Sequence, residues 1–378
     1  MTQLDDFKAQ CMALCKMENR QINKTSPVWI FGAGQFGRDL CSVLRNRDYE
    51  VAGFIETKPK QKEIAGYPVL SWSELDASQR QMQLAIGIFN RETPMDKLQS
   101  LAHDAGFKEV LMPWHLYEQF GDDLGWRYWL GSSKLILNAL QRIESVYQNL
   151  FDDLSKQCML DILSFRLGVN DPYASFRHDD NQYFNELTLP ALQGKKINYI
   201  DGGAYNGDTY LELANLSTIS SAFLFEPDRE NYNQLKTNVE QFKNKTLCLP
   251  LALTDSYSIL SFNGDAGEGG AISGAGTQHI ATVSLDEMLQ QQSIDLIKLD
   301  VEGAEIPAIK GASRLIRESR PTLAISLYHR PEDIWEIPEL VFSLCKDYRF
   351  YIRQHYFNSF DSVLYAVPLQ VMLFGAIV

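Results

Sequence analysis

Short apolar runs alternate with stretches of helical composition along most of this 378-residue chain. The runs at Val28–Phe31, Val51–Ile55 and 197–200 consist largely of branched and aromatic side chains, which favour strands. Segments such as 38–47 and 229–241 have the composition of helices. Strands that alternate with helices are typical of an α/β fold with mostly parallel sheets, and we predict that class here.

A first glycine-rich turn follows the run at Val28–Phe31, in the sequence Gly-Ala-Gly-Gln-Phe-Gly. Its glycines are Gly32, Gly34 and Gly37, and Glu56 ends the next strand, 24 residues beyond Gly32. A strand, this glycine pattern, a helix and a later acid predict a Rossmann-type nucleotide site. Its loop carries no acid, so it can accept phosphate, while the acid suits a ribose diol. The alternative is that the glycines serve packing alone and nothing binds.

A second glycine-rich turn, which begins at Asp201 and ends at Asp208, joins a predicted strand to a predicted helix. The glycines inside it let the backbone approach a ligand closely; they are Gly202, Gly203 and Gly207. Two carboxylates here would repel a pyrophosphate and attract a ligand that carries an ammonium and a sulfonium. S-adenosylmethionine is such a ligand, and the alternative is a tight turn with solvated acids.

Acids also follow later predicted strands of the same half. Glu226 lies 25 residues beyond Asp201 at the tip of the next strand, where an acid binds ribose hydroxyls. Asp255 and Asp300 end two further apolar runs. We predict that these four acids lie on one rim of a parallel sheet, the edge at which such folds bind ligands.

Residues 196–368 resemble the FkbM family of S-adenosylmethionine-dependent methyltransferases. The resemblance rests on the motifs Asp201-Gly-Gly-Ala-Tyr-Asn-Gly-Asp-Thr209, Phe225-Glu-Pro-Asp-Arg-Glu-Asn231, Leu251-Ala-Leu-Thr-Asp255, Thr282-Val-Ser-Leu-Asp-Glu-Met-Leu289 and Ile297-Lys-Leu-Asp-Val-Glu-Gly-Ala-Glu305. It implies a class I methyltransferase fold, with a seven-stranded sheet that is parallel except for one strand.

The resemblance also implies roles for single residues. The second turn, including Asp201, would line the methionine part of the cofactor, Glu226 would bind its ribose and Asp255 would face its adenine. Asp300 and Glu302 would stand where the donor methyl meets the acceptor.

An acceptor hydroxyl needs a base, because its own pKa lies far above neutral. His329 follows an apolar strand and is expected at the same rim, so His329 and Asp300 are the two base candidates, with Glu302 beside them. A divalent ion held by these three residues is a weaker alternative, and we expect no metal.

The N-terminal half resembles the small nucleotide-binding domain of bacterial sugar O- and N-acyltransferases. The matching segments are Ile30-Phe-Gly-Ala-Gly-Gln-Phe-Gly37, Val51-Ala-Gly-Phe-Ile-Glu56 and Gly66-Tyr-Pro-Val-Leu70. In that family the domain holds a nucleotide sugar, so the resemblance implies a nucleotide-sugar or glycan acceptor.

Composition narrows the partners. The net charge of −13 argues against nucleic acid and anionic membranes, and no apolar run is long enough to span a bilayer. Six scattered cysteines without a CxxC pair, and no signal peptide, predict a reducing cytoplasm. Residues 264–276 contain six glycines and predict a mobile loop, either a lid or an insertion.

We therefore predict two Rossmann-like domains joined by a helical segment. The predicted parts are a helical lead-in at 1–26, a nucleotide-binding domain at 27–125, a helical connector at 126–195, a methyltransferase domain at 196–368 and an apolar tail at 369–378. The tail is either a packed terminal segment or a dimer contact.

The predicted function is S-adenosylmethionine-dependent O-methylation of a sugar or another small metabolite. Two alternatives stay open. One is an NAD-dependent oxidoreductase or epimerase that uses the Gly32 turn, although the chain lacks an obvious Tyr-x-x-x-Lys pair. The other is a non-catalytic nucleotide-binding protein.

Overall fold

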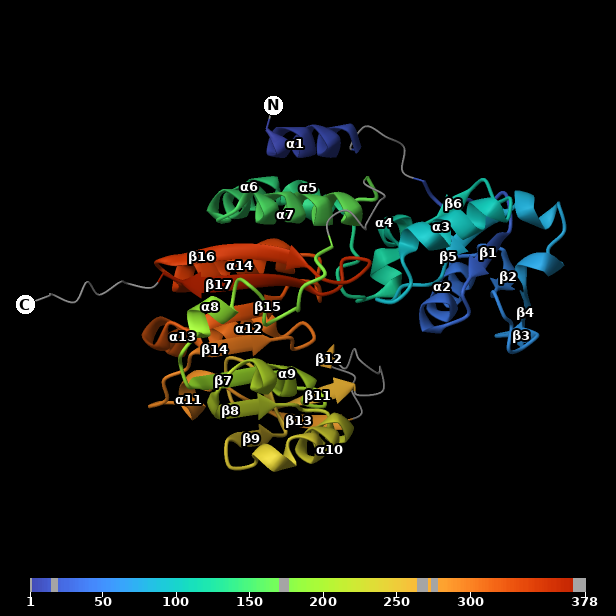
Figure 1. Cartoon of the computed structure of the whole chain (residues 1–378). Helices are drawn as coiled ribbons and strands as arrows, with labels where there is room; N and C mark the ends of the chain where they lie inside the picture. The colour runs from blue at the N-terminus through green and yellow to red at the C-terminus, as the bar shows by residue number, and fades with distance from the viewer. Residues whose placement is uncertain (1, 15–19, 170–176, 264–270, 273–277, 370–378) are drawn as a thin grey trace, which may run out of the picture. The chain divides into compact units, whose positions relative to one another are not determined.

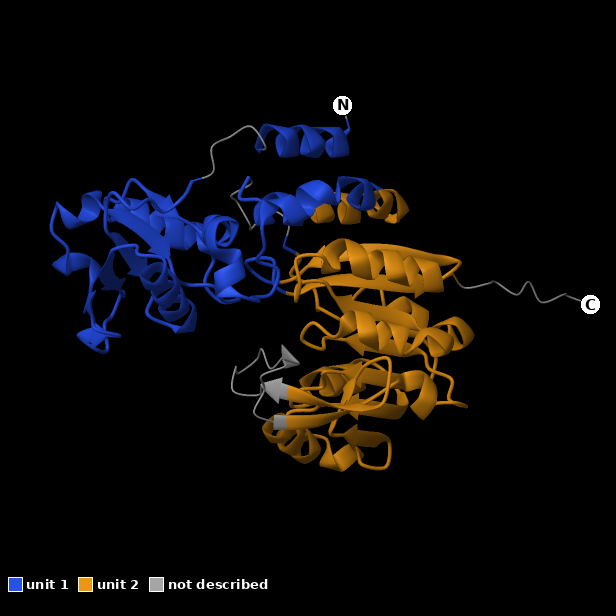
Figure 2. Cartoon of the chain, turned by 180° about the vertical axis from the view of Figure 1, so that it is seen from behind, with its two compact units in different colours: residues 1–144, 160–177, 356–360 blue, residues 145–159, 178–355, 361–378 orange. Residues whose placement is uncertain are grey.

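The computed structural model describes residues 2–14, 20–169, 177–263, 271–272 and 278–369. Two predictions fall largely outside these residues, those for the glycine-rich loop at 264–276 and for the apolar tail at 369–378. The structure tests neither of them. The chain forms two compact units, coloured in Figure 2. Unit 1 comprises 1–144, 160–177 and 356–360, and unit 2 comprises 145–159, 178–355 and 361–378.

Unit 1 contains a six-stranded sheet in the order β3-β4-β2-β1-β5-β6. Its strands are parallel apart from the short antiparallel strand β3. The strands are β1 (Val28–Phe31), β2 (Val51–Ile55), β3 (Glu63–Ile64), β4 (Tyr67–Leu70), β5 (Gln83–Ile86) and β6 (Val110–Leu111). The helices, with α1 first in the chain, are α1 (Gln3–Leu14), α2 (Gln35–Asn46), α3 (Met95–Asp104), α4 (Pro113–Leu124) and α5 (Ser133–Asn138).

Strand β1 is wholly buried because it lies between β2 and β5. Strand β5 ends at Ile86, directly before Gly87. A Cβ at Gly87 would stand 2.7 Å from Cγ2 of Ile30 and 2.9 Å from the Cα of Gly37, so the chain turns there through a tight space.

Unit 2 is built on a seven-stranded sheet in the order β16-β17-β15-β14-β7-β8-β9 (Figure 1). Only β17 runs antiparallel to its neighbours, so the predicted methyltransferase-type sheet is confirmed. Its strands are β7 (Ile197–Gly202), β8 (Ile219–Phe225), β9 (Thr246–Leu249), β14 (Leu296–Leu299), β15 (Thr322–Ser326), β16 (Tyr348–Gln354) and β17 (Ser362–Pro368).

Unit 2 also contains helices that precede the first strand of this sheet or lie between its strands. They are α8 (Leu189–Leu192), α9 (Asp208–Leu216), α10 (Arg229–Asn238), α11 (Leu285–Met288), α12 (Glu305–Lys310), α13 (Ser313–Ser319) and α14 (Asp333–Leu344). Helices α6 (Leu140–Asn149) and α7 (Asp153–Arg166) each contribute residues to both units. The core of unit 2 unites apolar side chains of the central strands with those of α9 and α10, for example Tyr199, Leu213, Leu224 and Leu235.

A separate four-stranded sheet has the order β10-β13-β11-β12. Its strands are β10 (Leu251–Leu253), β11 (Ser258–Asn263), β12 (Ala271–Ile272) and β13 (Gln278–Val283). Because β10 pairs with β13, Asp255 follows a strand of this smaller sheet. The predicted placement of Asp255 on the rim of the parallel sheet was therefore wrong.

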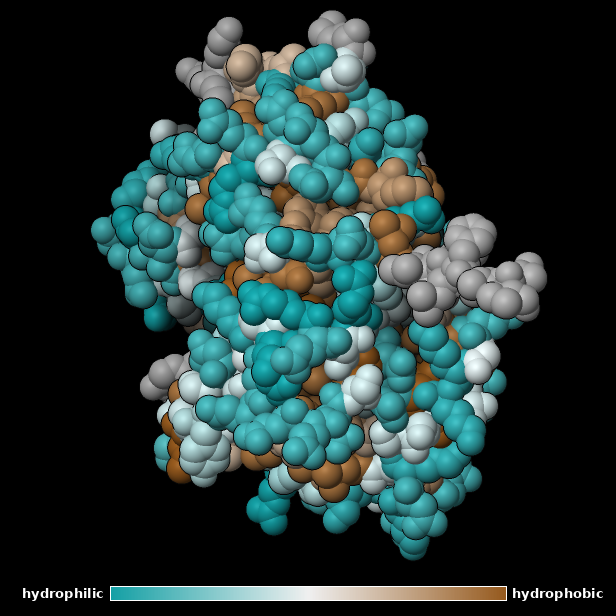
Figure 3. Space-filling model, turned by 90° about the vertical axis from the view of Figure 1, so that its left-hand side faces the viewer, coloured by the Kyte–Doolittle hydropathy of each residue, from teal (hydrophilic) through white to brown (hydrophobic). Residues whose placement is uncertain are grey.

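The surface is mixed in character. On the face drawn in Figure 3, hydrophilic side chains surround separate hydrophobic groups. Among the described residues, no helix combines the length and the apolar character that crossing a bilayer would require.

Candidate functional site

The turn after β7 brings the backbone of three strands close together. Gly203 has a φ of +75°, and a Cβ there would stand 1.9 Å from the carbonyl oxygen of Asp300, so only glycine fits without a shift of the backbone. The amides of Gly203 and Ala204 both donate to the carbonyl of Phe225. Gly207, with a φ of +87°, precedes the first residue of α9. The turn is thus fixed between the ends of β8 and β14.

Asp201 has no exposed surface and forms an ion pair with Lys298, whose Nζ lies 3.0 Å from Oδ1 of Asp201. Lys298 Nζ also donates to the carbonyls of Gly203 at 2.6 Å and Gly202 at 3.3 Å. Burial lowers the pKa of Lys298, but the nearby carboxylates, with Asp201 foremost, outweigh that effect and raise it. Burial raises the pKa of Asp201, and Lys298 opposes that rise. Lys298 therefore stabilises the turn through its carbonyl groups and neutralises the charge of Asp201.

Glu226 follows β8 and lies almost fully buried beside the turn. Its Oε2 accepts from the amide of Tyr205 at 2.8 Å, and its Oε1 accepts from the amide of Asp228 at 2.9 Å. Burial raises the pKa of Glu226 to about 7, although these two hydrogen bonds oppose the shift. Each oxygen has a lone pair left, so the side chain can still accept from a ligand hydroxyl.

Asp208 and Asp255 differ from these buried groups. Asp208 is exposed in the first turn of α9, and its Oδ1 accepts from the amide and the hydroxyl of Thr209. Asp255 is exposed and pairs locally with the hydroxyl of Ser256.

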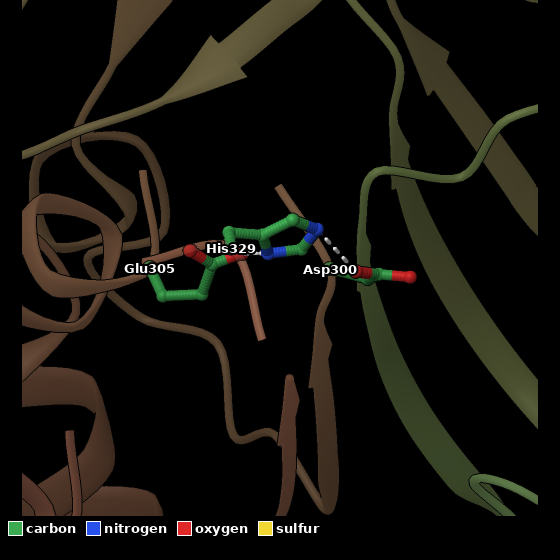
Figure 4. Close-up of side chains that lie close together, drawn as sticks. All are labelled: Asp300, Glu305 and His329. Atoms are coloured by element: carbon green, nitrogen blue, oxygen red, sulfur yellow. Dashed lines mark ion pairs between the residues drawn. The ribbon is translucent and has the colours of Figure 1, made fainter. Parts of the chain in front are cut away.

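His329 lies among carboxylates on both sides of its ring (Figure 4). Its Nδ1 is 2.9 Å from Oε1 of Glu305, while its Nε2 is 3.4 Å from Oδ1 of Asp300 and 3.5 Å from Oε2 of Glu302. Burial lowers the pKa of the imidazole, but the carboxylates outweigh it and raise the pKa well above its ordinary value. An imidazole that already holds its proton is a poor base, so without a bound ion this ring is a positioned cation, and it would have to lose the Nε2 proton before it could act as a metal ligand.

Two tyrosines position Asp300 at the end of β14. Tyr183 donates to its Oδ2 at 2.8 Å, and Tyr328 donates to its Oδ1 at 3.1 Å. Burial raises the pKa of Asp300, but the positive charges of His329 and Lys298 outweigh it and lower the pKa. Asp300 is therefore ionised and held in a fixed orientation.

Two further acids lie close to His329. Burial raises the pKa of Glu302 to about 8, and its side chain keeps a quarter of its surface exposed. Burial and Glu305 raise the pKa of Asp333 to about 7, and its Oδ2 accepts from the amide of Arg330. Within the described residues, Asp300, Glu305 and His329 offer ligand atoms within 4.8 Å of one another, which is compact enough for a metal ion.

The structure thus brings Asp300, Glu302 and His329 together at the carboxyl ends of β14 and β15, with the Gly203 turn next to them. Sequence reasoning assigned no role to Lys298, Glu305 or the two tyrosines. One signal was available for Lys298, since a lone lysine inside the apolar run of β14 has to find a buried partner. Glu305 is the last residue of the motif that begins at Ile297, but only the fold shows which ring nitrogen of His329 it contacts.

In unit 1, the Gly32 turn has the close packing of its motif. Gly32 has a φ of +105°, and a Cβ at Gly37 would stand 1.9 Å from the carbonyl oxygen of Gly32. A Cβ at Gly34 would meet no atom within 4 Å. Arg38 folds back and donates to the carbonyl of Ala33. Glu56 follows β2 and is partly exposed.

Comparisons with known proteins agree with this architecture. A solved structure of methyltransferase FkbM from Methylobacillus flagellatus KT has a TM-score of 0.75 and 21% identity, covering 96% of this chain and 99% of that one. At this identity it shows the fold alone. The hexuronic acid methyltransferase AglP of Haloferax volcanii is 27% identical over 107 residues, which is 27% of this chain. The aligned region spans 45% of that relative, less than half its length.

The family model of the methyltransferase FkbM domain matches residues 201–359, a range that begins at Asp201 and includes the Gly203 turn, Glu226 and the His329 cluster. The family and the fold together support a methyltransferase. The resemblance of the N-terminal half to sugar acyltransferases is supported by none of these matches. Residues 201–359 of this chain therefore match a methyltransferase FkbM domain.

Proposed function

We propose that the chain transfers the methyl group of S-adenosylmethionine to a hydroxyl of a sugar or a related small metabolite. One juxtaposition carries the proposal: the glycine turn after β7 and Glu226 lie beside the cluster of Asp300, Glu302 and His329, at the carboxyl edge of one parallel sheet. Ligands of open α/β sheets bind at this edge. The name of the Haloferax relative supports a sugar acid as the class of acceptor.

The cofactor half of the site consists of the turn and Glu226. The backbone of Gly203 and its neighbours would approach the methionine part, and Glu226 would accept from the ribose hydroxyls. Lys298 and Asp201 would act on the ligand only through the turn that they support. Gly202, Gly207 and Asp208 complete the predicted cofactor contacts, and Asp255 is proposed to face the adenine edge.

The cluster around His329 forms the acceptor half. In methyl transfer the C–S bond breaks as the O–C bond forms, the sulfur keeps the electron pair and leaves as a neutral thioether. The hydroxyl proton passes to a carboxylate of the Asp300–Glu302–His329 group. Positioning supplies most of the rate enhancement in such an in-line displacement, and the tyrosine hydrogen bonds to Asp300 fix one member of this group.

Isothermal titration of the purified full chain with S-adenosylmethionine tests the cofactor half. We expect one site per chain, and Glu226→Gln raises its Kd about 10- to 100-fold, because a hydrogen bond to a charged acceptor contributes about 1.5–3 kcal/mol. Glu230→Gln, an exposed carboxylate four residues on, is the matched control. No binding by the wild-type chain would refute the proposal.

The acceptor is tested by transfer of a labelled methyl group from the cofactor to a panel of free hexuronic acids, nucleotide sugars and glycans. We expect labelled product from at least one of these acceptors. In the host, we propose that the reaction takes place in the cytoplasm. We further propose that the Gly32 turn of unit 1, with Gly34, Gly37 and Glu56, binds a nucleotide. A nucleotide titration of the chain, repeated with Glu56→Gln, checks this second site.

A further inference from the structure

The contacts of His329 divide into two sets, one for each ring nitrogen. Glu305 is at hydrogen-bond distance from Nδ1, whereas Asp300 and Glu302 face Nε2 from 3.4 and 3.5 Å. The two ring nitrogens point in different directions. An ion bound to Nε2 would therefore lie on the side of Asp300 and not on the side of Glu305. Figure 4 shows the ring between the two carboxylates.

Glu305 is built to hold the ring. It is the first residue of α12 and only 1% exposed, and its Oε1 also accepts from the amide of Val301 at 2.8 Å. A carboxylate that accepts from Nδ1–H fixes the tautomer and leaves Nε2 as the lone-pair nitrogen, which is the usual outer arrangement of a metal-bound histidine.

The cluster also places four carboxyl groups around a single imidazole. Asp300, Glu302, Glu305 and Asp333 surround one histidine that has no exposed surface. Oε2 of Glu302 and Oε2 of Glu305 are buried atoms, and neither makes a hydrogen bond within the described part of the chain. Buried carboxylate oxygens normally find a donor or a cation.

We propose that His329 Nε2, Asp300 and Glu302 bind one divalent cation, with Glu305 as the residue that positions the imidazole. Two carboxylates with one imidazole suit Mn²⁺ or Mg²⁺, with water in the remaining positions. The inference replaces our expectation from the sequence that this site holds no metal. The cation site itself does not depend on the reaction.

Its use in catalysis rests on the proposed function. A bound ion would take the acceptor hydroxyl as a ligand and lower its pKa. With Asp300 and Glu302 bound to the ion, the hydroxyl proton would pass to solvent water at the partly exposed edge near Glu302 and not to a carboxylate of the cluster, while the methyl group moves from sulfur to oxygen. The ion would also orient the hydroxyl towards the Gly203 turn.

The test uses the full chain, freed of metal with a chelator, and the electron paramagnetic resonance signal of added Mn²⁺ without cofactor or acceptor. We expect one saturable site per chain and competition by Mg²⁺. Glu302→Gln and His329→Ala should weaken binding at least tenfold, and Glu305→Gln about tenfold, the effect typical of an outer carboxylate. Glu287→Gln, an exposed carboxylate of α11, should bind as the wild type does.

Circular dichroism shows whether each variant folds, and Glu302→Gln, at the partly exposed edge, is the variant expected to fold in any case. Absence of saturable Mn²⁺ binding, or unchanged binding in folded Glu302→Gln, overturns the metal site. Binding of Zn²⁺ but not Mn²⁺ overturns the class of ion. The outcomes separate from those of the proposed function: a chain that binds Mn²⁺ but no S-adenosylmethionine keeps the site and loses the reaction. A metal-free chain that binds no Mn²⁺ but still transfers the methyl group at the full rate keeps the reaction and loses the metal site.

Discussion

Lys298 and Asp201 occupy partner positions in the register of β14 and β7, and their side chains form an ion pair of 3.0 Å with almost no exposed surface. The sequence suggested that this aspartate faces the ligand. The structure instead shows its charge neutralised by the neighbouring strand, while the lysine donates to the carbonyl of Gly203. On the proposed function, electrostatic attraction of a cationic cofactor would therefore depend on the other acids of the rim.

Removal of the lysine should be costly. Lys298→Met leaves the carboxylate of Asp201 buried without its partner, and we expect a loss of about 3–5 kcal/mol in the free energy of unfolding. The double variant Asp201→Asn with Lys298→Met should lose less than Lys298→Met alone, because no buried charge remains. Urea denaturation of the single and double variants measures both. Losses that simply add would contradict a coupled pair.

Gly203→Ala should disturb the turn far more than a matched glycine substitution. Both Gly203 and Gly194 have positive φ, at +75° and +76°, but a Cβ at Gly194 meets no atom within 4 Å. Gly194→Ala should therefore cost only the backbone strain, about 1 kcal/mol. Gly203→Ala adds a clash with the Asp300 carbonyl, and we expect a total of about 3 kcal/mol or more. Thermal denaturation compares the two, and equal losses would show that the turn relaxes freely.

Cofactor affinity should rise with pH through neutrality. Burial holds the pKa of Glu226 at about 7, so below this pH the carboxyl keeps its proton and above it the group is an ionised acceptor. Affinity for S-adenosylmethionine is therefore expected to increase from pH 6 to pH 8, by about tenfold if the ionised form supplies one charged hydrogen bond. Calorimetry at both pH values measures the change. Glu226→Gln should bind weakly at both, and a variant that kept the full pH dependence would assign it to another group.

The Gly32 turn of unit 1 offers a paired test of packing against binding. Gly37→Ala places a Cβ 1.9 Å from the carbonyl of Gly32 and should destabilise unit 1 by about 1–3 kcal/mol. Gly34→Ala meets no neighbour, so the stability should stay within about 0.5 kcal/mol. If a nucleotide lies against this turn, Gly34→Ala weakens its binding without unfolding the unit. Unchanged nucleotide affinity would favour a turn whose glycines serve packing alone.

The sequence predicted the strands of the parallel sheets well, because buried strands leave a strong local signal. The predicted bounds of β1 and β2 coincide with the observed ones, since one run of apolar residues ends at a glycine and the other at an acid. Asp255 was misplaced because an apolar run does not reveal which sheet it joins. That choice depends on β13, more than twenty residues further on.

The site was only partly predictable for a related reason. An acid at a strand end pointed to Asp300, a histidine after an apolar strand pointed to His329, and the family resemblance implied Glu302; the structure brings the three together. The pairing of Lys298 with Asp201 depends on the register between two strands almost a hundred residues apart, and local patterns do not encode it. The contact of Glu305 with Nδ1 of His329 likewise requires α12 to start next to the end of β15.

The interleaving of the two units along the chain limits how they can be separated. Residues 356–360 belong to unit 1, yet they connect β16 to β17 of unit 2, and residues 160–177 likewise return to unit 1. No single cleavage of the polypeptide releases either unit intact. A truncation that starts near residue 196 would still contain residues 356–360, which belong to unit 1. Ligand assays on the separate units therefore require circular permutation or replacement of residues 356–360.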